Sequence, residues 1–185
     1  MSYVALRFYA ELNDFLRHAQ KQTRFKIELN RRTSVKDLIE SLGVPHTEVE
    51  VILANGKSVD FSYIVKREDE LSIYPMFESV DVTPILQLRG EPLRDTRFVL
   101  DCHLGRLARY LRQFGFDTLY RNDYTDDELA DTSSSEHRVL LTRDRSLLKR
   151  SIITHGYFIR EHDPRKQLDE VIRRFDLRNQ IIPFG

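Results

Sequence analysis

The stretch that decides the fold is RFVLDCHLGRLARYLRQFGFDTLY, residues 97–120. It opens with a short apolar run that predicts a buried strand, and apolar side chains then recur at helical spacing from Leu104 to Phe114. Gly115 ends this helix, and residues 118–120 predict a second short strand. A strand, a helix and a second strand in immediate succession form the unit from which parallel sheets are built.

The same alternation continues through the rest of the second half. Further strands are predicted at residues 139–142 and 157–160. Further helices are predicted from Thr125, where Glu128 completes a capping box, at residues 146–150, and from Pro164. Strands and helices in alternation predict an α/β fold with a doubly wound parallel sheet over residues 96–185.

Aspartates follow three of the predicted strands: Asp101, Asp123 and Asp144. In a doubly wound sheet the ligand site lies outside the carboxyl ends of the strands, so these carboxylates are expected to converge there. Carboxylates that share a site repel each other unless a cation neutralises them. The sequence therefore predicts a magnesium or manganese site, since such ions prefer oxygen ligands, activate water and stabilise charge on a phosphate. The alternative for each aspartate is a cap or turn role.

Arginine dominates the basic residues of the second half, since 14 of the 16 Lys and Arg in residues 96–185 are Arg. The arginine side chain is a planar fork that suits phosphate groups. A stripe on the predicted helix and a pair flanking Asp144 are expected to contact phosphates. These residues are Arg106, Arg109, Arg112, Arg143 and Arg145. The alternative is a solvated surface paired with nearby acids.

The first half predicts a smaller α+β domain. Its helix at residues 33–43 has a Thr-Ser start, apolar residues on one face and a terminal glycine. Asn55-Gly56 is a tight turn signal. The order of two strands, a helix and two further strands is that of a β-grasp fold. The strands are expected at residues 4–9, 24–29, 49–53 and 70–75.

The remaining composition limits the class of protein. Cys102 is the single cysteine, which excludes an internal disulfide and a cysteine-based zinc site. No apolar run is long enough for a membrane span and the N-terminus lacks signal-peptide features, so we expect a cytoplasmic protein. Pro84, Pro92 and mixed charge predict a linker at residues 81–95 between domains at residues 1–80 and 96–185.

The strings DCHLGRLARYLR (residues 101–112) and LLTRDRSLL (residues 140–148) resemble the Mut-seven C-terminal RNase-like domain, a branch of the PIN-like nucleases. The resemblance implies a PIN-like sheet, magnesium or manganese, and endoribonuclease activity on RNA. The residues that match the catalytic acids of the family are Asp101, Asp144 and one of Asp127 or Glu128. Asp123 is a further candidate, and Asp163 is the candidate for a fourth acid. Family members commonly continue into a four-cysteine zinc ribbon, and the sequence up to Gly185 contains no such cysteines.

The segments VALRFYAEL (residues 4–12) and DELSIYPMF (residues 69–77) resemble ubiquitin-like sulfur carriers of the ThiS and MoaD type. Those carriers end in Gly-Gly, whereas here the chain continues through residues 78–81 without it. Carrier chemistry is therefore not expected, and docking of a protein partner or of RNA is the remaining role. The alternative to the nuclease for the whole chain is a non-catalytic RNA-binding or adaptor protein.

Overall fold

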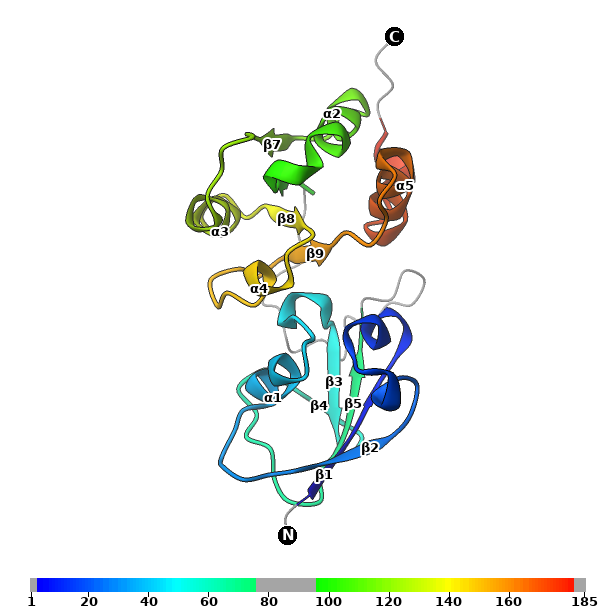
Figure 1. Cartoon of the computed structure of the whole chain (residues 1–185), viewed down its shortest axis with the longest axis vertical. Helices are drawn as coiled ribbons and strands as arrows, with labels where there is room; N and C mark the ends of the chain where they lie inside the picture. Colours follow the sequence, from blue (N-terminus) through cyan, green and yellow to red (C-terminus); the bar gives the residue numbers. More distant parts are fainter. Residues whose placement is uncertain (1–2, 76–95, 182–185) are drawn as a thin grey trace. The chain divides into compact units, whose positions relative to one another are not determined.

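The computed structural model describes residues 3–75 and 96–181, and the chain divides into two compact units, residues 1–90 and 91–185 (Figure 1). The linker expected at residues 81–95 lies outside the described residues. In the described ranges, no helix is both long enough and apolar enough to cross a membrane.

The C-terminal unit contains a four-stranded sheet in which all neighbouring strands are parallel. Its order is β7-β6-β8-β9. The strands are β6 (Phe98–Leu100), β7 (Thr118–Tyr120), β8 (Val139–Thr142) and β9 (Gly156–Phe158). The chain runs from β6 to its neighbour β7 on one side, and then returns to β8 on the other side, so the strand order reverses between β6 and β8.

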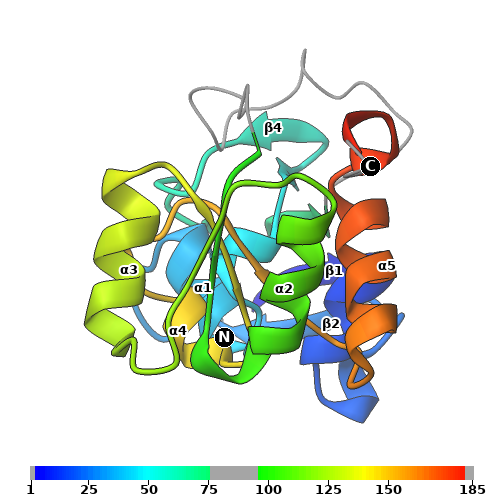
Figure 2. The ribbon, with the colours of Figure 1, turned by 90° about the horizontal axis from the view of Figure 1, so that it is seen from above.

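Helices cover both faces of this sheet, as Figure 2 shows, with α3 on one side and α2 and α5 on the other. The helices are α2 (Gly105–Gln113), α3 (Asp126–Ser135), α4 (Arg145–Leu148) and α5 (Pro164–Arg174), with short 3-10 turns at η5 (Cys102–Leu104) and η6 (Leu177–Gln180). The expected helix at residues 104–114 therefore begins with a 3-10 turn.

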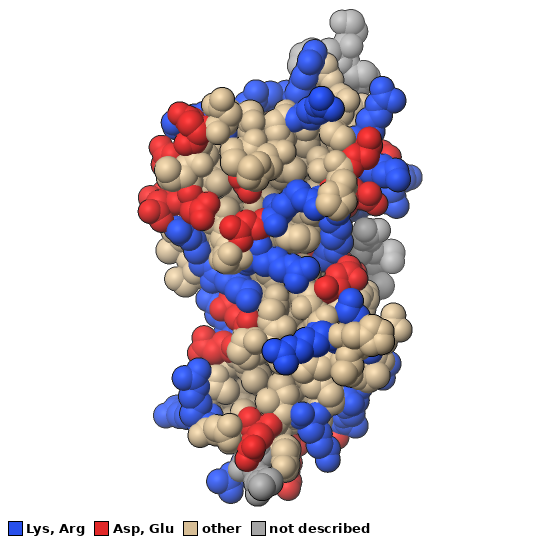
Figure 3. Space-filling view, in the orientation of Figure 1, with Lys and Arg blue, Asp and Glu red and all other residues tan. Residues whose placement is uncertain are grey.

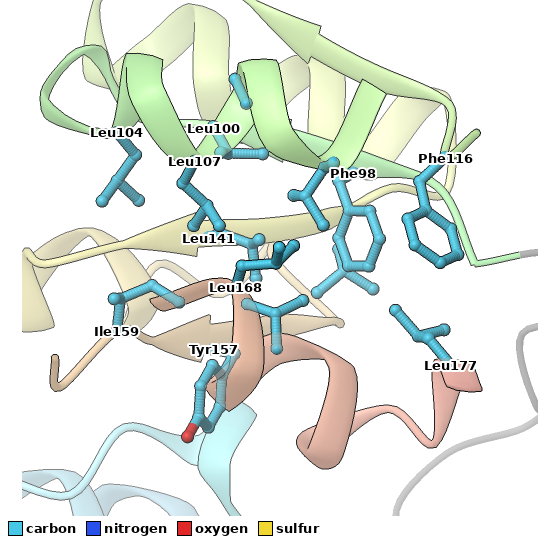
Figure 4. Close-up of a cluster of buried hydrophobic side chains, with 14 residues drawn as sticks. Phe98, Leu100, Leu104, Leu107, Phe116, Leu141, Tyr157, Ile159, Leu168 and Leu177 are labelled. Carbon is cyan, nitrogen blue, oxygen red and sulfur yellow. The ribbon is translucent and has the colours of Figure 1, made fainter. Parts of the chain in front are cut away.

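Two separate cores result from the alternation of side chains along each strand. Phe98 and Leu100 pack with the apolar faces of α2 and α5, in the larger cluster drawn in Figure 4. Val99, the residue between them, packs instead with Leu129 of α3 and Leu147 of α4. A strand that is buried on both faces has no polar alternation, which explains the continuous apolar run at residues 98–100. The predicted doubly wound α/β sheet is confirmed.

The N-terminal unit has a mixed five-stranded sheet of order β2-β1-β5-β3-β4, in which β1 and β5 form the parallel central pair. This arrangement with one helix is the predicted β-grasp fold. The elements are β1 (Tyr3–Phe8), η1 (Ala10–Phe15), η2 (His18–Gln20), β2 (Phe25–Glu28), α1 (Val35–Ser41), η3 (His46–Glu48), β3 (Val51–Ala54), β4 (Lys57–Val59) and β5 (Glu70–Tyr74).

Local signals in the sequence account for the turns of this unit. The Ser34 hydroxyl caps α1 by accepting a hydrogen bond from the Asp37 backbone N–H at 3.1 Å. Asn55 and Gly56 both have positive φ, 52° and 78°, as the tight hairpin between β3 and β4 requires.

Candidate metal and nucleic-acid site

The candidate site lies where the strand order reverses. Asp101 directly follows β6, and Thr142 is the last residue of the neighbouring strand β8. The carboxyl ends of these two parallel strands form the crevice in which doubly wound sheets bind ligands. Only 9% of Asp101 is exposed, and Thr142 is fully buried.

A single hydroxyl connects the two loops that carry aspartates. Thr142 Oγ1 donates a hydrogen bond to Asp101 Oδ2 at 2.7 Å. The same oxygen accepts a hydrogen bond from the Asp144 backbone N–H at 2.9 Å. Thr142 therefore fixes Asp101 and the Asp144 loop relative to each other, a role that the sequence did not indicate.

Asp144 is the N-cap of α4, and its hydrogen bonds fall on one of its two carboxylate oxygens. Oδ1 accepts from the Ser146 N–H at 2.7 Å, the Ser146 hydroxyl at 2.5 Å and the Leu147 N–H at 3.3 Å. The hydrogen bond from the Ser146 hydroxyl, with those from the backbone and the charge of Arg150, lowers the pKa of Asp144. Within residues 3–75 and 96–181, Oδ2 of this ionised carboxylate has no hydrogen-bond partner, so it can accept a further ligand.

Asp101, Cys102 and His103 form a group of possible metal ligands whose ligating atoms lie within 4.8 Å of one another. The hydrogen bond that the Cys102 thiol donates to Asp101 raises the pKa of this thiol, and burial raises it further. The thiol is therefore protonated at neutral pH. The backbone of this turn is held from β7, because the Tyr120 hydroxyl donates to the Cys102 carbonyl oxygen at 2.8 Å. Tyr120 is a second residue that sequence reasoning missed.

The described part of the chain brings neither Asp144 nor Asp123, the other two predicted metal ligands, into this group. Asp123 accepts hydrogen bonds from Arg121 Nε at 3.0 Å and Nη2 at 3.2 Å, and both side chains are largely exposed. The ion pair with Arg121 lowers the pKa of Asp123. The structure thus gives Asp123 a local partner two residues away, where the sequence suggested a metal ion.

The two candidates for the middle acid, Asp127 and Glu128, both lie in the first turn of α3 but have different partners. Glu128 completes the predicted capping box: its Oε2 accepts from the Thr125 N–H at 2.9 Å, and its own N–H donates to Thr125 Oγ1 at 3.2 Å. Asp127 pairs instead with Arg150. Because Arg150 also contributes to the lowered pKa of Asp144, this arginine connects Asp127 electrostatically to the β8 loop.

Asp163, the candidate fourth acid, is the N-cap of α5. Its Oδ1 accepts hydrogen bonds from the backbone N–H groups of Arg165 at 3.0 Å and Lys166 at 3.1 Å. These contacts explain an aspartate immediately before Pro164 by capping alone.

Three of the five candidate phosphate-binding arginines have structural contacts. Arg112 Nε donates to the Thr118 carbonyl oxygen at 2.9 Å, and Arg143 Nη1 donates to the Glu161 carbonyl oxygen at 2.5 Å. The Arg145 guanidinium lies 5.2 Å from the centre of the Phe158 ring. Arg106 and Arg109 are exposed, and neither forms an ion pair with any residue that the structure describes.

Comparison with known proteins agrees with this architecture. The C-terminal unit is an α/β domain with a PIN-like parallel sheet, preceded by a ubiquitin-like unit. Residues 1–81 match the Mut7-C ubiquitin family and residues 96–184 match the Mut7-C RNAse domain family, and the chain thus has the two-domain layout of Mut7-C proteins. The match of residues 96–184 to an RNase domain family indicates a nuclease-like role for the second unit.

Two solved structures are similar to part of the chain. One is the H. volcanii small archaeal modifier protein 1, with 17% identity, and the other is a putative molybdopterin converting factor, subunit 1, from Pyrococcus furiosus, with 22% identity. Each match covers 40% of this chain and 98% of the other, with a TM-score of 0.32. No curated protein matches the sequence.

Proposed function

We propose that the C-terminal unit is a metal-dependent endoribonuclease whose site is centred on Asp101. The observation that carries the proposal is the environment of this carboxylate. It is almost buried at the point where the strand order reverses, and no Lys or Arg of the described ranges pairs with it. A buried carboxylate without a cation is costly, and a bound divalent ion removes that cost.

The donor atoms near Asp101 fit a divalent ion. The Asp101 carboxylate offers hard oxygen ligands of the kind that magnesium and manganese select. Oδ2 of Asp144, whose loop is tied to Asp101 through the Thr142 hydroxyl, is the second oxygen ligand of the proposed site. His103 adds a nitrogen ligand within reach of the Asp101 carboxylate, and such a ligand suits manganese better than magnesium. A divalent ion held there supplies Lewis-acid activation of water and neutralisation of phosphate charge.

The other residues of the site orient these ligands. The Thr142 hydroxyl fixes the carboxylate of Asp101 and the loop of Asp144, while Tyr120 holds the backbone at Cys102. We assign the middle acid to Asp127, because Glu128 is already engaged in the capping box. Arg150 pairs with Asp127 and also contributes to the lowered pKa of Asp144 in the β8 loop.

RNA is the proposed substrate, with Arg106 and Arg109 contacting its phosphates. These exposed guanidinium groups lie on α2, the helix that follows Asp101. Arg112 uses only its Nε in the hydrogen bond to Thr118, so its terminal nitrogens can contact a phosphate as well. Arg143 and Arg145 contact other loops and strands of the unit, and we assign them mainly a structural role. The N-terminal unit is proposed to dock a protein partner, since residues 1–81 match a ubiquitin-type family.

The test is cleavage of a pool of labelled RNAs by the full chain, with manganese and with chelator. We expect metal-dependent cleavage that falls by at least about a hundredfold in Asp101→Asn and in Asp144→Asn, in line with loss of a metal ligand. Asparagine is an equally good N-cap, so Asp144→Asn keeps α4 capped. Asp169→Asn, an exposed position on α5, is the matched control and should cleave normally.

Two results would contradict the nuclease. Cleavage that is equal in the Asp101→Asn protein and the control would place the activity elsewhere. Retained RNA binding without cleavage in any metal would favour the alternative, a non-catalytic RNA-binding or adaptor protein.

A further inference from the structure

The surface of α2 carries two adjoining hollows. The larger, of about 790 Å³, is lined by Gly105, Arg109, Arg112, Gln113 and Tyr120. The smaller, of about 340 Å³, is lined by Arg106, Arg109, Tyr110 and Gln113. Both share Arg109 and Gln113, so the two hollows are neighbours, and each contains one tyrosine.

One wall of the larger hollow contacts the turn that follows Asp101. The Tyr120 side chain on its wall donates its hydroxyl to the Cys102 carbonyl oxygen at 2.8 Å. Gly105 makes room for this contact, because a Cβ there would lie 2.7 Å from the Tyr120 hydroxyl oxygen. The same ring therefore borders the hollow and fixes the turn that carries Asp101.

The distribution of charge on the C-terminal unit favours binding of a polyanion at the surface of α2. Figure 3 shows acidic side chains gathered over α3 and basic side chains around α2. Asp126, Asp127, Glu128 and Asp131 give α3 its acidic surface. A phosphate backbone is repelled from that side and attracted to Arg106 and Arg109, whose charges no described acid neutralises.

We infer that these hollows bind two successive nucleotides of a single-stranded RNA and lead that strand to Asp101, an inference that rests on the proposed nuclease function. Tyrosine rings stack on unpaired bases, arginine contacts the phosphates between them, and the Gln113 amide hydrogen-bonds a base edge. In a duplex the bases are stacked on one another and cannot enter the hollows. The site thus selects unpaired RNA.

Binding is measured apart from cleavage, by fluorescence anisotropy of a short labelled RNA with the full-length Asp101→Asn protein in chelator. The same strand annealed to its complement is the second ligand. We expect the single strand to bind at least about tenfold more tightly than the duplex, because stacking on one aromatic ring contributes that factor or more. Equal affinity for both, or tighter binding of the duplex, overturns the inference.

Two substitutions test the hollows themselves. Tyr110→Leu should weaken binding of the single strand by about tenfold and leave the duplex unaffected. Arg109→Ala should reduce the slope of log affinity against log salt by about 0.7, the value for one phosphate contact on a single strand. Arg173→Ala, which removes an exposed arginine of α5 outside both hollows, is the matched control.

The outcomes separate this inference from the proposed function. Equal effects of Arg109→Ala and Arg173→Ala would show that general charge, and not the hollows, binds RNA. Selective single-strand binding that depends on Tyr110 and Arg109 supports the site even where the wild-type chain cleaves nothing, and in that case the nuclease proposal fails alone.

Discussion

The Thr142 hydroxyl oxygen lies 2.7 Å from Asp101 Oδ2 and donates a hydrogen bond to it from the end of the adjacent strand. Because Thr142 also accepts from the Asp144 N–H, its removal affects both aspartates. Partners that orient a metal ligand typically contribute about 10- to 100-fold to metal affinity. We expect Thr142→Val to weaken manganese binding by that factor, measured by calorimetric titration.

Thr142→Ser is the control for this prediction, since it keeps the hydroxyl and loses only a methyl group. Affinity close to that of the wild type is expected for it. If valine and serine weaken manganese binding equally, packing at this buried position, and not the hydrogen bond, sets the affinity.

A second prediction separates the two candidates for the middle acid. Glu128→Gln preserves the capping box, because glutamine also serves at this position, so fold and cleavage should be unchanged. Asp127→Asn removes the charge that pairs with Arg150 and should lower the cleavage rate by at least about tenfold. Single-turnover cleavage of labelled RNA measures both, and the reverse order of effects would assign the role to Glu128.

The fold was predictable because its signals are local in the sequence. The apolar run at residues 98–100, the helical spacing after Leu104 and the Thr125–Glu128 capping box each specify one element, and the structure confirms all three. Short connections then leave few topologies open. The β-grasp unit followed in the same way from the Ser34 cap and the Asn55-Gly56 turn.

The site was less predictable, because the sequence shows that an aspartate follows a strand but does not show which partner its side chain contacts. Asp123 turns to Arg121, two residues away, and Asp163 caps α5. In the sequence, Thr142 is one more β-branched residue of a predicted strand. Only the pairing register of β6 with β8 shows that its hydroxyl lies at Asp101. Contacts between distant segments decide such roles.

A third prediction concerns the close approach of Gly105 to Tyr120. In an unobstructed helix, alanine stabilises relative to glycine by about 1 kcal/mol. Here its Cβ would lie 2.7 Å from a hydroxyl that is held by the Cys102 carbonyl. We therefore expect Gly105→Ala to lower the free energy of unfolding by about 1–2 kcal/mol, as overpacking does.

Urea denaturation measures this effect, and a double-mutant cycle identifies its cause. In the Tyr120→Ala background the obstruction is gone, so Gly105→Ala should become neutral or stabilising. A loss of stability of the same size in both backgrounds would mean that the alanine disturbs something other than the tyrosine.

The last prediction concerns acid stability and the ion pair between Asp117 and Arg138. Arg138 is buried and donates from Nη1 and Nη2 to the two carboxylate oxygens at 2.8 and 3.1 Å. This pair lowers the pKa of Asp117 in the folded state. A carboxyl with a lower folded than unfolded pKa stabilises the fold above its unfolded pKa, about 3.9. That contribution is lost as pH falls through the folded pKa.

Asp117→Asn should therefore lower the free energy of unfolding at pH 7 and have a smaller effect below about pH 3. Because the Asp117 side chain is 52% exposed, solvent screens the pair and the difference at pH 7 should stay below about 1 kcal/mol. Urea denaturation at both pH values measures it, with Asp169→Asn as an exposed carboxylate control. A destabilisation that is the same at pH 7 and pH 3 would mean that the loss comes from the neutral contacts of Asp117, and that the charge of this residue contributes nothing to the fold.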